Sequence, residues 1–137
     1  MTAKEYLLQY KWLTARLEAV EKDLDSLRVA RESMSVNYDG MPHGTGISDK
    51  TAKLAAEIVD MESKLLDLRS ELWRKRIEIS DTIGKTKNAD YNSLLYMRYI
   101  EGCTWEEIAV EMHYTFRWVL VLHGRALDEI QKILENS

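Results

Sequence analysis

The sequence predicts an all-α protein in which a long antiparallel coiled-coil hairpin precedes a C-terminal helix-turn-helix domain. Residues 2–34 and 49–83 contain neither proline nor glycine, and both stretches carry apolar residues at heptad spacing. A glycine-rich segment separates them. The last third of the chain shows shorter helical patterns interrupted by turn and capping residues. We therefore expect a coiled-coil arm over 1–84 and a helix-turn-helix domain over 85–137.

The first long helix has an apolar seam with steps of three and four residues, which is typical of a coiled coil. The seam consists of Ala3, Tyr6, Tyr10, Leu13, Leu17, Val20, Leu24, Leu27, Arg31 and Met34. Arg31 interrupts it, but an arginine stem can pack while its charged end stays in water. Leu7, Leu8 and Val29 fall outside the seam, so we expect them to seek a third helix or another subunit.

The second long helix carries a matching seam, with Leu66 and Trp73 outside it. This seam consists of Leu54, Ile58, Met61, Leu65, Leu68 and Leu72, and continues less regularly through Ile79 and Ile83. Two helices of similar length with one connection favour an antiparallel hairpin. Burial of large apolar side chains, worth about 1.5–3 kcal/mol each, would drive the pairing. A two-helix core is thin, so we also expect a homodimer.

The connection over 35–48 contains three glycines and the only proline of the chain, Pro42. This composition is typical of an irregular chain reversal. A phosphate-binding glycine loop is disfavoured, because the Gly-Lys-Ser/Thr ending and a preceding strand are both missing. A further interpretation is that His43 at the tip of an exposed loop contacts a partner.

Three shorter helices are predicted after Gly84. Asp90 is expected to cap the first, and Gly102 to end it in a left-handed conformation. The sequence Thr104-Trp-Glu-Glu107 is a capping-box pattern that predicts the start of the second helix. The chain should then turn at 113–114, and Thr115 should cap the last helix. The apolar residues expected to face the core are Ile108, Ala109, Met112, Val119, Leu122, Ala126, Ile130 and Ile133.

The string from Arg98 to Met112 resembles the promoter-reading helix-turn-helix in the fourth region of sigma factors. Together with Arg117-Trp-Val and Leu122-His-Gly-Arg-Ala-Leu127, it resembles the sigma-factor-like, ArpU-like regulators of phages and prophages. The N-terminal Thr2-Ala-Lys-Glu-Tyr and the stretch 40–51 extend this resemblance over nearly the whole chain. It implies a transcription regulator whose last helix enters the major groove of double-stranded DNA.

The last helix departs from the sigma-factor pattern, because apolar side chains occupy places where basic or amide side chains would read bases. The residues expected to face DNA are Thr115, Arg117, Trp118, Val121 and Arg125. Phe116, Trp118 and Leu120 would instead form an apolar patch of the kind that binds protein, unless Trp118 and Leu120 pack against the arm as ordinary core. Residues 85–137 contain six basic and eight acidic side chains, which limits the phosphate contacts available to one subunit.

The residues give little reason to expect catalysis or a cofactor. His43, His113 and His123 are widely spaced and form no usual zinc motif with Cys103. A single cysteine excludes an internal disulfide and suits a reducing compartment. Helix capping accounts for one of the two residues Glu106 and Glu107, and the other is expected on a solvent-exposed helix face, so the pair does not indicate acid–base catalysis. We therefore expect no enzyme, no metal site and no small-molecule substrate.

Composition places the chain among soluble proteins, with 45% apolar and 31% charged residues. There is neither a signal-peptide pattern nor an apolar run of about 18 residues, so we expect a cytoplasmic protein that does not bind membranes. The formal net charge of −4 lowers the expectation of DNA binding without excluding a local basic patch. The alternatives to a DNA-binding regulator are an adaptor that binds RNA polymerase or a phage protein, and a purely structural oligomer.

Overall fold

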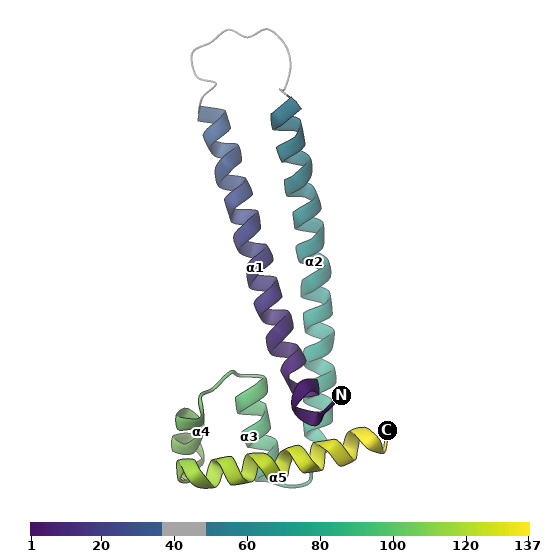
Figure 1. Ribbon diagram of the computed structural model, residues 1–137, viewed down its shortest axis with the longest axis vertical. Helices are drawn as coiled ribbons and strands as arrows, with labels where there is room; N and C mark the ends of the chain where they lie inside the picture. The colour runs from purple at the N-terminus through teal and green to yellow at the C-terminus, as the bar shows by residue number, and fades with distance from the viewer. Residues whose placement is uncertain (37–48) are drawn as a thin grey trace. The chain divides into compact units, whose positions relative to one another are not determined.

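The computed structural model describes residues 1–36 and 49–137, and all regular secondary structure within these ranges is helical. Its five helices are α1 (Ala3–Val36), α2 (Asp49–Gly84), α3 (Ala89–Tyr99), α4 (Trp105–Met112) and α5 (Phe116–Glu135) (Figure 1). The predicted all-α class is confirmed. Apart from Ser35 and Val36, where α1 ends, the predicted connection lies outside the described residues, as do the interpretations placed on its glycines and on His43.

The chain divides into two compact units. One comprises residues 1–14 and 72–137, and the other comprises residues 15–71. We call them the C-terminal unit and the two-helix unit. The division assigns the first turns of α1 and the last turns of α2 to the same unit as α3, α4 and α5. The division into domains 1–84 and 85–137, which the sequence predicts, stays a prediction.

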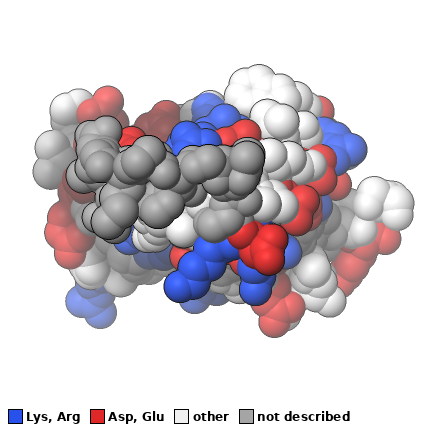
Figure 2. Space-filling model, turned by 90° about the horizontal axis from the view of Figure 1, so that it is seen from above, with Lys and Arg blue, Asp and Glu red and all other residues white. Residues whose placement is uncertain are grey.

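The net negative charge of the chain resides in the two-helix unit. Residues 15–71 contain eight basic and twelve acidic residues, whereas the C-terminal unit contains eleven of each. Side chains of both signs lie interspersed on the face seen in Figure 2. The net charge of −4 of the whole chain therefore does not describe the C-terminal unit, whose formal charges balance.

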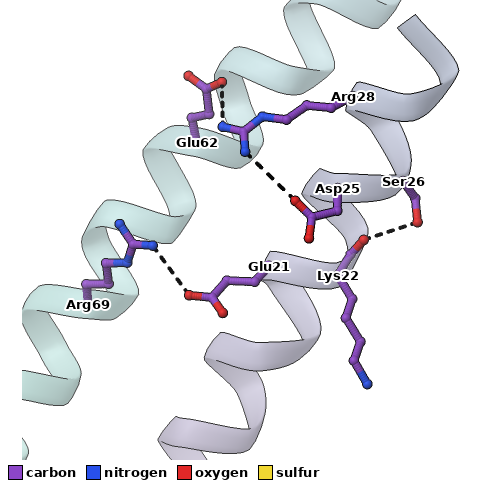
Figure 3. A network of polar contacts seen from close by, with 7 residues as sticks. All are labelled: Glu21, Lys22, Asp25, Ser26, Arg28, Glu62 and Arg69. Carbon is purple, nitrogen blue, oxygen red and sulfur yellow. Dashed lines mark hydrogen bonds and ion pairs between the residues drawn. The ribbon is translucent and has the colours of Figure 1, made fainter. Parts of the chain in front are cut away.

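In the two-helix unit, apolar residues from the two predicted seams form one cluster. Its buried members are Val20, Leu24, Ile58, Leu65 and Leu68, with Leu17, Leu27, Leu54 and Met61 packed against them. Two ion pairs join the helices beside this cluster, Arg28 with Glu62 at 3.3 Å and Arg69 with Glu21 at 3.4 Å (Figure 3). The paired positions ascend in α1 while they descend in α2, so the two helices run in opposite directions within this unit.

The C-terminal unit has a larger core to which all five helices contribute. Its buried residues are Ala3, Leu7, Ile79, Ile83, Leu94, Leu95, Tyr99, Ile100, Ile108, Ala109, Val119, Leu122, Ala126 and Ile130. Leu7, which lies outside the heptad seam, is fully buried here. The third helix expected for Leu7 and for the partly buried Leu8 is thus found within the same chain. Val29, Leu66 and Trp73 are exposed.

Polar contacts tie the first turns of α1 into the C-terminal unit. The backbone N–H of Ala3 donates to Oε1 of Gln131 at 2.8 Å, which supplies one of the unpaired amides at the start of α1 with a partner. The hydroxyls of Tyr6 and Thr82 share a hydrogen bond of 2.9 Å. These bonds join α1 to α5 and α2 in addition to the apolar packing.

Within residues 1–36 and 49–137, none of the helices combines the length and the apolar character that crossing a bilayer requires.

Candidate nucleic-acid interface

Side-chain caps fix the starts of α3 and α4. Oδ1 of Asn88 accepts hydrogen bonds from the backbone N–H groups of Asp90 and Tyr91, so Asn88, and not the predicted Asp90, caps α3. Asn88 precedes the helix with an extended backbone, the conformation a cap requires, whereas Asp90 already lies inside it. Thr104 caps α4 as predicted, and its Oγ1 accepts from the N–H of Glu107 at 3.1 Å.

The capping-box geometry at Thr104 is only half formed. In a full box, the glutamate side chain accepts from the backbone N–H of the cap residue. Here the hydroxyl of Thr104 donates to Oε1 of Glu107 at 3.1 Å. Gly102, with φ of 75°, takes the left-handed conformation that the sequence predicted after α3.

The turn between α4 and α5 uses a left-handed residue. His113 has φ of 59°, and its backbone N–H bonds to carbonyl oxygens of the last turn of α4. The hydroxyl of Tyr114 donates to Oδ2 of Asp90 at 2.8 Å, which ties the turn to α3. Thr115 caps α5 as predicted, because its Oγ1 accepts from the N–H of Trp118 at 3.1 Å. The direction in which α5 leaves the turn is therefore fixed by backbone and side-chain bonds together.

The helix α5 has one buried face and one solvent face. Val119, Leu122, Ala126 and Ile130 lie in the core, and α5 packs against both α3 and α4. The opposite line of residues, Arg117, Val121, Gly124 and Asp128, has the spacing of a single helix face and is exposed. The predicted core positions Ile108 and Ala109 of α4 are buried too, while Met112 and Ile133 are partly buried.

The residues predicted to face DNA are all exposed. Thr115 also serves as the cap, so its hydroxyl has a structural bond. The guanidinium of Arg125 lies over the ring of Trp118, with Cζ 5.2 Å from the ring centroid. This distance is within the range of a cation–π interaction, which keeps the charge of Arg125 beside the ring of Trp118. Arg117 and Val121 share the outermost line of the helix.

Large apolar side chains are also exposed on the first turns of α5. The exposed fractions are 44% for Phe116, 39% for Trp118, 41% for Leu120 and 41% for Val121. Val110 of α4 is 75% exposed. Trp118 and Leu120 are therefore not core residues, which was the alternative to a binding surface. A contiguous apolar patch is typical of a surface that contacts another molecule, whereas single exposed apolar side chains are common on any protein surface.

Tyr99, Trp105 and His123 form a polar cluster that no local sequence pattern indicates; Tyr99 is buried, and Trp105 and His123 are partly buried. The hydroxyl of Tyr99 and Nε2 of His123 are 2.6 Å apart, and the ring of Trp105 packs edge-on against His123 at 4.5 Å between centroids. Burial, together with the positive charges of Lys4 and Arg98, lowers the pKa of His123 to about 4. The ring is therefore neutral at pH 7 and adds no charge between Arg117 and Arg125.

Arg98 extends this cluster toward the start of α4. Its guanidinium lies over the ring of Trp105 at 4.2 Å and donates to the carbonyl oxygen of Cys103 at 3.1 Å. Burial, with the nearby carboxylates of Glu101 and Glu107, raises the pKa of the Cys103 thiol. A helix N-terminus would lower the pKa of a thiol, whereas the pKa of Cys103 is raised, chiefly by burial. Cys103 is thus a poor nucleophile at neutral pH.

Across residues 1–36 and 49–137, no three His, Cys, Asp or Glu side chains come close enough together to hold a metal ion.

Comparison with known proteins gave one family. Neither the curated proteins nor the solved structures gave a significant match. A family model described as "Protein of unknown function (DUF1492)" matches residues 35–130, which is more than half of the chain. The chain belongs to this DUF1492 family.

Proposed function

We propose that this protein is a transcription regulator that binds double-stranded DNA through a helix-turn-helix formed by α4 and α5. The resemblance of residues 98–127 to the fourth region of sigma factors and to ArpU-like phage regulators suggests the function. One observation carries it: α5 is held by its buried face, while Arg117, Val121 and Arg125 stand on its solvent face. An outward helix of this kind is what the major groove admits.

Charge and composition also suit a DNA partner of moderate affinity. Arg117, Arg125 and Lys132 are the exposed cations of α5, and the C-terminal unit as a whole has no excess of acidic residues. Three cations reach few phosphates, so one subunit alone would bind weakly. A homodimer doubles these contacts, and we propose that the protein works in the cytoplasm as such a dimer.

The test is the salt dependence of binding to duplex DNA, measured by fluorescence anisotropy with phage promoter fragments and a random duplex. Affinity should fall steeply between about 50 and 200 mM salt. Arg117→Ala and Arg125→Ala should each weaken binding and reduce the slope of log affinity against log salt by about 1 per subunit. Arg74→Ala, which removes an exposed arginine of α2, is the matched control and should change neither. Absence of binding at the lowest salt overturns the proposal.

The second candidate is an adaptor that binds protein instead of DNA. The exposed aromatic side chains of Phe116 and Trp118, next to Leu120, favour it, because such a patch offers no hydrogen-bond code for bases. Purified RNA polymerase from the bacterial host is the first partner to test, by measuring its capture on the immobilised protein. Trp118→Asp should abolish capture. Trp73→Asp, an equally drastic change at an exposed tryptophan of α2, should leave it intact.

A further inference from the structure

A groove of about 520 Å³ lies between α1 and α2 within the two-helix unit. The least exposed residues of its lining are apolar, Leu27 of α1 and Met61 of α2. Both pack against the buried cluster of this unit, yet each stays only partly buried. The volume is within the range of about 300–1,000 Å³ that is usual for binding pockets. Two helices thus leave part of their common seam open to another molecule.

The exposed part of the lining is mainly acidic. Asp23 of α1, together with Glu57 and Asp60 of α2, outnumbers the cation of the described lining, Lys64. Three carboxylates and one ammonium leave a formal charge of −2 beside the apolar residues. Among residues 1–36 and 49–137, no ion pair involves any of these four side chains. The groove therefore offers uncompensated negative charge next to apolar surface.

The cross-helix ion pairs of Figure 3 lie on the other flank of the same helix pair. Glu21 and Arg28 each directly follow a seam residue of α1, and their partners each directly follow a seam residue of α2. Asp23 and Glu57 instead directly precede seam residues, which places them on the opposite flank of an antiparallel pair. Pairing of α1 with α2 therefore does not account for the acidic lining.

We infer that this groove binds a basic amphipathic helix of a partner protein. A helix that lays its apolar face into a groove is a recurrent mode of recognition, and a groove between two helices accepts a third as in helical bundles. Apolar side chains of the partner would cover Leu27 and Met61. Lysines or arginines beside them would pair with Asp23, Glu57 and Asp60. The inference does not depend on the proposed DNA binding.

Charge separates this occupant from two others. A second copy of the two-helix unit brings a formal charge of −4, from eight basic and twelve acidic residues, and so repels the groove. Duplex DNA brings phosphates, which the carboxylates repel as well. A basic amphipathic helix brings the complementary charge together with apolar side chains that match the apolar part of the lining.

The probe for the test is a fluorescent synthetic peptide that forms a helix with leucines on one face and lysines on the other. Two control peptides are used, one with glutamates in place of the lysines and one with the original residues reordered so that no apolar face forms. Anisotropy titrations with the full chain should show binding of the first peptide and of neither control. The affinity should fall as salt rises, because the carboxylates of the groove are exposed to solvent.

Asp60→Lys and Asp67→Lys form a matched pair of variants. Both aspartates are exposed and occupy the same heptad position of α2, but of the two it is Asp60 that lines the groove. Asp60→Lys should weaken binding of the lysine peptide by about tenfold or more, because it turns an attraction into a repulsion. Asp67→Lys changes the net charge equally, about 10 Å further along the helix, and should weaken binding less than about twofold. Circular dichroism should show wild-type helicity in both.

Each other outcome overturns the inference in its own way. Equal losses in the two variants would mean diffuse attraction to an acidic surface, so the groove would not be the site. Equal binding of the glutamate peptide, or no binding of the lysine peptide at low salt, excludes a basic helix as the occupant. If Asp60→Lys changes the sedimentation of the protein alone, a second copy occupies the groove. Failure of DNA binding leaves the inference untouched, because Arg117 and Arg125 take no part in it.

Discussion

The hydroxyl oxygen of Tyr99 lies 2.6 Å from Nε2 of His123, and this hydrogen bond joins α3 to α5 behind the proposed DNA-binding face. Both groups are held uncharged. Burial raises the pKa of Tyr99 to about 12 and is the main cause of the lowered pKa of His123. The orientation of α5 thus depends in part on a neutral imidazole packed against Trp105.

The first prediction is a loss of stability in mild acid. His123 has a pKa of about 4 in the folded protein, while the unfolded chain protonates near the ordinary value of 6.5. Between these values the unfolded state binds more protons, so the free energy of unfolding should decrease as pH falls from 6.5 toward 4. His123→Gln should flatten this decrease in urea titrations at several pH values. An unchanged pH dependence in the variant would assign the effect to other groups.

The second prediction contrasts two leucines of the long helices. Leu7 is fully buried in the C-terminal unit, whereas Leu66 is 62% exposed. Leu7→Ala should cost about 2–5 kcal/mol of unfolding free energy, because it removes buried contacts and leaves a cavity. Leu66→Ala should change it by less than about 0.5 kcal/mol, as exposed substitutions usually do. Denaturant unfolding compares the two, and equal losses would contradict the burial of Leu7.

These leucines also show what the sequence could and could not predict. Heptad spacing identified residues that become buried in each long helix, and it identified the buried face of α5. It did not indicate that Leu7, outside the seam, would share a core with α3–α5. Periodicity reports which face of a helix is apolar, but it does not report which distant segment covers that face.

The polar residues likewise divide into those whose role depends on neighbours in sequence and those whose role depends on distant segments. The sequence predicts Thr104 and Thr115 as caps because a cap bonds to amides two or three residues away, so the pattern is local. Asn88 and Asp90 are both residue types that cap helices, and only the backbone conformation decides between them. The role of His123 depends on Tyr99, Trp105 and Lys4, which come from three other helices, and no local pattern could bring them together.

The third prediction concerns the cap of α5. Thr115→Ala removes the acceptor for the N–H of Trp118, which should lower the free energy of unfolding by about 1 kcal/mol. Thr115→Ser keeps the hydroxyl and should stay within a few tenths of the wild-type value. DNA affinity measured on the same variants separates the two roles of this residue. If serine restores stability but not binding, the methyl group of Thr115 contacts the DNA.

The last prediction tests the pairing of the long helices. The ion pairs Glu21–Arg69 and Arg28–Glu62 lie seven residues apart in each helix, forward in α1 and backward in α2. This is the register expected of an antiparallel coiled coil, whose flanking positions form interhelical pairs. All four side chains are between 41% and 55% exposed, so solvent screens them. Each pair should therefore contribute only about 0.2–1 kcal/mol.

A double-mutant cycle with Glu21→Gln and Arg69→Gln isolates that coupling from the effect of each substitution alone. The coupling should be measurable at low ionic strength and should vanish near 1 M salt, where charges are screened within about 3 Å. The reversed pair, Glu21→Arg with Arg69→Glu, should recover most of the stability that either reversal loses by itself. Failure of this recovery would mean that the two side chains do not face each other, and the antiparallel register of residues 15–71 would then be wrong.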